Sequence, residues 1–153
     1  MSLASTRRQG QRHSMALGRR QSKGFANAQD IALQHRAMHE RFPGFFCRTG
    51  STGIVWHGTL QPRKVSPAYL VEIRYERNCA PRVFVTQPPL AGGCPHLYRD
   101  GSLCLYWPEE RKWGPRVLVA LTLVPWAALW LLYYELWLDT GKWLCPSSHV
   151  PEG

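Results

Sequence analysis

A short run of the chain, residues 94–105, brings together the side chains best suited to chemistry. Cys104 lies between two leucines, and His96 lies eight residues before it. A cysteine thiolate is a strong nucleophile and a good acyl acceptor even when only a small fraction of the thiol is ionised. An imidazole can orient such a thiol, act as its base, or donate a hydrogen bond to a developing oxyanion. The pair is therefore a candidate acyl-transfer site with Cys104 as its nucleophile.

Two other interpretations of this run stay open from the residues alone. Cysteine is among the most buried residue types, so the Leu-Cys-Leu sequence of residues 103–105 could be core. His96 could equally be a loop histidine that backbone groups satisfy. Zinc binding by Cys94, His96 and Cys104 is disfavoured, because a fourth ligand at a familiar spacing is missing. We expect neither a metal nor a cofactor.

Length and cysteine usage indicate one domain in a reducing compartment. The chain has 153 residues, and a domain of that size buries roughly 70% of its unfolded surface, so it needs no disulfides. Its five cysteines are an odd number without a CxxC pair. The basic N-terminus is not followed by an apolar stretch, so no signal peptide is expected. These features predict reduced thiols and a cytoplasmic protein.

The positive charge is concentrated at the N-terminus. The formal net charge is +9, and six basic residues with no acid among them precede Phe25. A Ser, Gln and Arg-rich segment cannot bury enough apolar surface to fold, so residues 1–24 are predicted to be a disordered basic tail. Contact with nucleic acid, contact with a membrane surface and a transit peptide are possible roles, but a solvated tail is favoured. Residues 25–145 are the predicted domain, and residues 146–153 a flexible C-terminus.

Hydrophobic spacing predicts one helix followed by four strands. Asn27 and Asp30 mark the helix start, and Pro43-Gly44 marks its end. The helical face expected to be buried carries Ile31, His35, Met38 and Phe42. The strands are expected at residues 45–49, 54–60, 69–75 and 83–86, at the spacing of an antiparallel meander. Residues 87–115 contain five prolines and four glycines, which predicts an ordered loop of functional importance.

Residues 117–134 run for 18 positions without a charge, and hydropathy alone would make them a transmembrane helix. Pro125 divides the run, and Glu135 and Asp139 follow it directly on a continuing helix. Four aromatic residues are spread along the helix rather than gathered at its two ends. We therefore favour a short helix and a second helix, with Pro125 in the first turn of the second, buried against the sheet.

Residues 94–105 resemble the active-site segment of ubiquitin-conjugating (E2) enzymes, which carry His-Pro-Asn, then Gly-x-Ile-Cys-Leu, and later Trp-Ser-Pro. This chain has Cys94-Pro95-His96, then Gly101 to Leu105 with the cysteine in place, and then Trp113-Gly114-Pro115 one residue later than usual. The similarity extends over about residues 26–140. It is greatest to the bacterial E2-like proteins of anti-phage CBASS operons, and three segments carry that likeness: Pro95 to Tyr98, Leu103 to Pro108, and Val124 to Gly141.

The resemblance implies an α+β, E2/UBC-like fold: an N-terminal helix, a four-stranded antiparallel meander, an active-site loop and C-terminal helices of a soluble domain. It makes Cys104 the thioester-forming residue and places His96 where E2 enzymes have an oxyanion-stabilising or loop-ordering Asn. Cys94 takes a structural position. Tyr106 replaces a common Asp, and no acid aligns with the one that tunes the incoming lysine; Glu109 and Glu110 are unassigned candidates.

The resemblance implies an E2-like transferase that regulates cyclic-oligonucleotide signalling against phage. The expected acyl donor is the C-terminus of a cGAS-like nucleotidyltransferase, with an E1-like protein as a further possible partner. No direct nucleic-acid partner and no membrane are expected. The chain has no Gly-rich nucleotide-binding motif, so another protein must activate the carboxyl group. Two alternatives are a non-catalytic E2-fold binding module and a Cys-His hydrolase that removes conjugates. The acceptor amine and the oligomeric state are left open.

Overall fold

The computed structural model describes residues 28–76, 79–106, 113–114 and 116–145. Several predictions from the sequence fall outside these residues and are not tested by the structure. They are the basic tail of residues 1–24, the C-terminus of residues 146–153, the helix start at Asn27, and Glu109 and Glu110.

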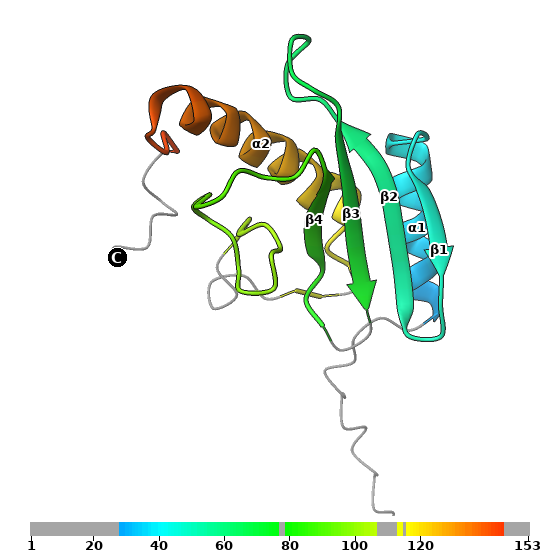
Figure 1. The fold of residues 1–153 in the computed structure, drawn as a ribbon. Helices are drawn as coiled ribbons and strands as arrows, with labels where there is room; N and C mark the ends of the chain where they lie inside the picture. The colour runs from blue at the N-terminus through cyan, green and yellow to red at the C-terminus, as the bar shows by residue number, and fades with distance from the viewer. Residues whose placement is uncertain (1–27, 77–78, 107–112, 115, 146–153) are drawn as a thin grey trace, which may run out of the picture.

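The described chain is an α+β fold whose elements follow the predicted order (Figure 1). A helix is followed by four strands, a long irregular segment, a 3-10 turn and a second helix. The bounds are α1 Ala28–Arg41, β1 Phe46–Thr49, β2 Gly53–Leu60, β3 Tyr69–Glu76, β4 Arg82–Gln87, η1 Val119–Leu121 and α2 Leu123–Thr140. The helix and the four-stranded meander are therefore confirmed, and each strand begins and ends within one residue of its predicted bounds.

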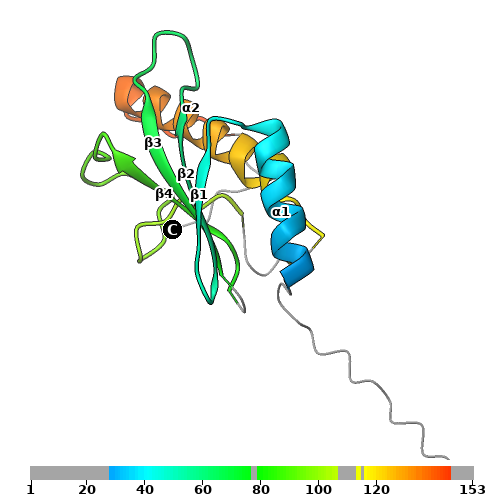
Figure 2. The ribbon, with the colours of Figure 1, turned by 90° about the vertical axis from the view of Figure 1, so that its right-hand side faces the viewer.

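The four strands pair with their sequence neighbours in the antiparallel order β1-β2-β3-β4. Side chains alternate between the two faces of a strand, so a half-buried strand shows alternating burial. In β3 the residues Tyr69, Val71, Ile73 and Tyr75 are buried, and those between them are exposed or half-buried. Both helices pack on the buried face, and Figure 2 shows α1 on that side of the sheet.

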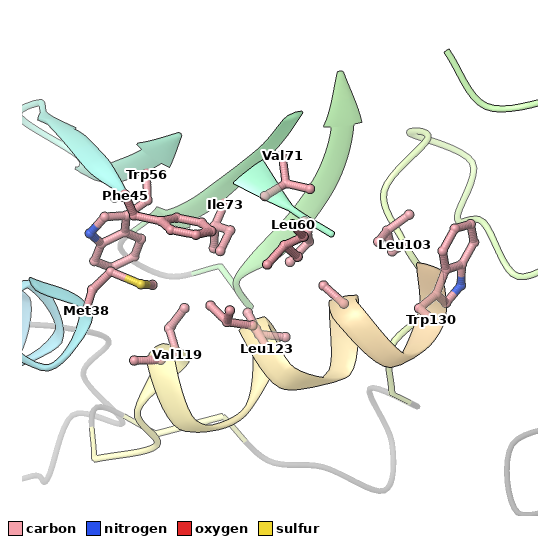
Figure 3. Close-up of a cluster of buried hydrophobic side chains, with 14 of the residues drawn as sticks. Met38, Phe45, Trp56, Leu60, Val71, Ile73, Leu103, Val119, Leu123 and Trp130 are labelled. Carbon is pink, nitrogen blue, oxygen red and sulfur yellow. The ribbon is translucent and has the colours of Figure 1, made fainter. Parts of the chain in front are cut away.

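The core lies between this face of the sheet and the two helices (Figure 3). Met38 reaches it from α1, Trp56 and Ile73 from the sheet, and Leu123 from α2. All four side chains are almost fully buried. Leu103 of the irregular segment joins the same cluster, which attaches the predicted functional loop to the core.

The predicted buried face of α1 is partly wrong. Met38 is buried, but His35 is exposed and its ring nitrogen Nδ1 lies 3.3 Å from the sulfur of Cys47. The buried polar residue on this face is Gln34, whose amide donates to the carbonyl of Val117 and accepts from the backbone of Val119. A buried side-chain amide is tolerated where both its oxygen and its NH₂ group form hydrogen bonds. Gln34 thereby ties α1 to the turn that precedes α2.

The C-terminal part contains one long helix rather than two. The short first helix is only the 3-10 turn η1, and α2 begins two residues before Pro125. Proline is tolerated there because the first N–H groups of a helix have no intrahelical acceptor. Gly141 ends the helix at φ 71°, with its N–H donating to the carbonyl of Trp137. Residues Val119–Thr140 are long and apolar enough to cross a membrane, but half of their most apolar window is buried inside the fold.

Candidate functional site

A tight hairpin over residues 97–103 positions the candidate nucleophile. The N–H of Gly101 donates to the carbonyl of Tyr98, and the N–H of Tyr98 donates to the carbonyl of Ser102. Gly101 has φ 84°, the left-handed conformation that a three-residue hairpin loop requires at this position. Leu97 and Leu103 face each other as an isolated bridge at its base. The Asp-Gly pair in the sequence is thus the turn that returns the chain toward Cys104.

The hairpin is anchored by Asp100. One carboxylate oxygen accepts from the backbone and the hydroxyl of Ser102, at 3.0 and 2.6 Å, and the other accepts from Arg82 of β4 at 2.7 Å. The Ser102 side chain, the Ser102 backbone and Arg82 lower the pKa of Asp100 to about 2, although burial acts in the opposite direction. The N–H of Leu103 also donates to the carbonyl of Val83. These bonds fix the segment before Cys104 to the last strand.

Cys104 lies at the end of this anchored segment with its side chain partly exposed. Its backbone N–H donates to the carbonyl of His96 at 2.9 Å, whereas the side chain of Leu103 is buried in the core. The interpretation of residues 103–105 as core is therefore right for Leu103, and Leu105 packs against the core, whereas Cys104 is only half-buried. A covalent nucleophile needs a backbone that is held in place and a thiol that is not fully enclosed.

His96 contacts Cys104 through its backbone. Its φ of 58° is uncommon for a residue other than glycine, and its carbonyl accepts from both the Cys104 N–H and the indole of Trp130. Its ring packs against Trp143, with 4.7 Å between centroids. Burial lowers the pKa of His96, so its imidazole is neutral at neutral pH. Among the described residues, no hydrogen bond joins this ring to the Cys104 sulfur, so the two side chains do not form a dyad.

Two tyrosines near Cys104 were not predicted as site residues. The hydroxyl of Tyr98 donates to the carbonyl of Tyr106. Burial, followed by the neighbouring Cys104, raises the pKa of Tyr98. Tyr106 is buried, and its own hydroxyl donates to the carbonyl of Pro81 at 3.0 Å. Tyr106 therefore braces the loop and does not substitute chemically for an exposed Asp. The sequence signal for Tyr98 was its place in the first arm of the hairpin.

The remaining cysteine of the run has a packing role. The thiol of Cys94 donates to the carbonyl of Pro95, and burial raises the pKa of Cys94 to about 11. That thiol is therefore protonated at neutral pH, in agreement with the structural position expected for Cys94. Within the part of the chain that the structure describes, no three His, Cys, Asp or Glu side chains gather closely enough to hold a metal ion.

Comparison with known proteins identifies the family of this chain. The family model for the type II CBASS E2 protein matches residues 34–150, which is well over half of the chain. No curated protein matches the chain. The matched region contains most of α1, the whole meander, the hairpin with Cys104, and α2. The chain belongs to the type II CBASS E2 protein family, and its helix, antiparallel meander and long C-terminal helix are the UBC-like fold that E2 membership implies.

Proposed function

We propose that this protein is an E2-like acyl transferase of the cytoplasm. Cys104 accepts the C-terminal carboxyl group of a partner protein as a thioester and passes it to an amine, which forms an amide bond. The proposed partner is the cGAS-like nucleotidyltransferase of the same defence system, and the conjugation regulates cyclic-oligonucleotide signalling. All five cysteines are free thiols, which suits a reducing compartment.

The observation that carries this proposal is the contrast between Leu103 and Cys104. Leu103 is 2% exposed and belongs to the core, while the next residue, Cys104, is only half-buried and has a free thiol. The hairpin bonds to β4 hold the backbone before Cys104, and the bond from the Cys104 N–H to the His96 carbonyl holds Cys104 itself. A binding module without chemistry would have no requirement for a thiol in this position.

The reaction has two balanced steps. In the first, the thiolate attacks an activated carboxyl carbon, a C–S bond forms, and the activating group leaves with its electron pair. In the second, the amine attacks the thioester carbon, the C–S bond breaks with its electrons on sulfur, and the amine releases a proton to solvent. Activation of the carboxyl group is the work of another protein, such as an E1-like enzyme.

Intact-mass analysis of the reaction with the nucleotidyltransferase tests the proposal. The protein is incubated with its partner and the activating components, and each sample is divided and treated with or without a thiol. We expect an adduct that the thiol removes and that peptide mapping assigns to Cys104. An adduct that resists the thiol, one mapped to another cysteine, or no adduct under conditions that activate the donor would refute the proposal.

His96→Ala tests whether the imidazole stabilises the oxyanion. Loss of one oxyanion donor slows acyl transfer by about 10²-fold, so we expect that decrease in the single-turnover rate of thioester aminolysis. His96→Asn restores a neutral donor and is expected to recover most of the rate. Because the His96 backbone at φ 58° also holds Cys104, thermal melting of each variant must accompany the kinetics. An aminolysis rate of His96→Ala equal to wild type would make His96 a purely structural residue.

A further inference from the structure

The segment that follows α2 turns back onto the loop that carries His96. Gly141 ends the helix in the left-handed conformation, and two residues later the indole of Trp143 packs against the imidazole of His96, with 4.7 Å between ring centroids. The same indole contacts Trp130 and Tyr133 of α2, at centroid distances of 5.2 and 6.2 Å. Trp143 is half-buried although it lies beyond the last helix. It is therefore fixed against α2 by two aromatic contacts while a third reaches His96.

His96 is held through its backbone and through its ring by different residues. Its carbonyl accepts from the Cys104 N–H at 2.9 Å and from the indole N–H of Trp130 at 3.2 Å, which sets the position of its backbone. Among the described residues, Trp143 is the one aromatic residue that packs against its ring. A side chain whose backbone is fixed can still change rotamer. The contact with Trp143 therefore limits the orientations that the imidazole can take beside the nucleophile.

The groups that face His96 from the elements packed around it are uncharged. The helix α2 contributes the indole of Trp130, and the segment after it contributes the indole of Trp143. The thiol of Cys94 donates to a backbone carbonyl, and Lys142 is exposed. Burial lowers the pKa of His96. A neutral imidazole has one N–H donor, and an indole ring packed against it fixes the direction of that donor without competing for its proton.

We propose that Trp143 is a positioning residue of the acyl-transfer site, which holds the imidazole of His96 in the orientation that stabilises the oxyanion. This inference rests on the function proposed above and adds the segment after α2, residues 141–145, to the site. Trp143 acts through His96 and exchanges no proton with the reacting groups. A displacement of about 1 Å in a catalytic group can cost on the order of 10²-fold in rate. A ring that fixes the donor therefore has a measurable effect on transfer.

The first measurement is a pH titration of the His96 ring by NMR, with its signal assigned from His96→Asn. Trp143→Ala uncovers one side of the imidazole, so the pKa of His96 should rise toward its ordinary value of 6.5. Trp143→Phe keeps a ring at this position and should retain most of the wild-type titration. Trp137→Ala is the matched control, since it removes an indole of α2 that packs against Tyr134 instead. An unchanged titration in Trp143→Ala, or an equal change in Trp137→Ala, would overturn the inference.

The second measurement is the single-turnover rate of thioester aminolysis. We expect Trp143→Ala to slow it about tenfold, less than the full loss of the donor, and Trp143→Phe to recover most of the rate. Trp143→Ala added to His96→Ala should cost nothing further, because residues that act through one another are not additive. A wild-type rate in Trp143→Ala, or an additive loss in the double variant, would refute the positioning role and leave the transferase function standing.

The two measurements separate this inference from the proposed function. The titration requires neither the acyl donor nor the amine. A raised His96 pKa in Trp143→Ala, together with a wild type that forms no thioester, would reject the transferase function and with it the catalytic meaning of the contact. If Trp143→Ala fails to fold, Trp143→Leu, which fills more of the space without an aromatic ring, takes its place in both measurements and is judged by the same outcomes.

Discussion

Cys104→Ala is expected to abolish the thiol-sensitive adduct and to reduce conjugation below detection. Removal of the nucleophile from a covalent mechanism costs up to about 10⁶-fold in rate, because the remaining groups cannot replace the lost intermediate. The thiol is only partly buried and its backbone is held by the His96 carbonyl, so the smaller side chain should leave the fold intact. The measurement is the rate of conjugate formation by gel and intact mass, with thermal melting as the check on folding.

The control for this variant is Cys79→Ala, which removes a partly buried thiol from the connection between β3 and β4. Its conjugation rate should equal that of wild type. Cys104→Ser supplies the complementary result, since an alkoxide is a poor leaving group and an ester on serine resists thiols. A stable, thiol-resistant adduct in Cys104→Ser would identify the attacking position directly. Normal conjugation by Cys104→Ala would assign the chemistry to another residue.

The meander could be predicted closely because its signals are local. Every second residue from Tyr69 to Tyr75 is apolar and buried, and the Gly-Ser-Thr-Gly sequence of residues 50–53 separates the first two strands. Such patterns depend on residues close in the sequence, and they do not depend on which element packs against the sheet. The resemblance to the CBASS E2 proteins was confirmed by the family match over residues 34–150. Here the sequence contains both the element order and the residues on which the resemblance was based.

The helices were predicted less well because their burial depends on distant partners. His35 and Gln34 are adjacent on α1, and spacing alone favoured His35 for the buried face. Gln34 is buried instead because it bonds with Val117 and Val119, more than 80 residues away. The first part of residues 117–134 likewise became only a 3-10 turn, since its backbone is held by this tertiary contact. No periodic pattern encodes such a bond.

In the candidate site, too, the local features could be predicted from the sequence, and the features that depend on tertiary contacts could not. Cys104 was identified from its type and its motif, and the structure places it, half-buried, directly after the hairpin of residues 97–103. The orientation of His96 could not be predicted, because it follows from the aromatic contact with Trp143 and from a positive φ. Tyr98 was overlooked because its role depends on the position of its hydroxyl, which donates to the carbonyl of Tyr106. That contact is a property of the folded hairpin and not of the spacing.

A network of buried hydrogen bonds centres on Glu135. This residue of α2 is 6% exposed, and its carboxylate accepts from Arg63, the Ser66 hydroxyl and the Tyr69 hydroxyl. These bonds join α2 to β3 and to the connection between β2 and β3. Burial raises the pKa of Glu135, but the donors from Ser66, Arg63 and Tyr69 outweigh it and lower the pKa. A buried carboxylate with four donated bonds stabilises the fold only while it is ionised.

Glu135→Ala is expected to lower the free energy of unfolding by about 3–5 kcal/mol, because it leaves the Ser66 and Tyr69 hydroxyls buried without an acceptor and removes the partner of Arg63. That is a large part of the ~5–15 kcal/mol by which a typical domain is stable. Urea unfolding at neutral pH measures the loss. Glu40→Ala removes an exposed carboxylate that pairs with Arg36, and it should leave the unfolding midpoint unchanged.

The pH dependence of stability shows whether Glu135 stabilises the fold through the charge of its carboxylate or only through the space that its side chain fills. A carboxyl group whose folded pKa is lowered stabilises the protein fully above its unfolded value near 4.5, and this contribution is lost as pH falls through the folded pKa. The stability difference between wild type and Glu135→Gln, which keeps the shape but not the charge, should therefore be constant above that value and shrink below it. A difference that does not change with pH would show that the charge of Glu135 contributes nothing to holding α2 against the sheet.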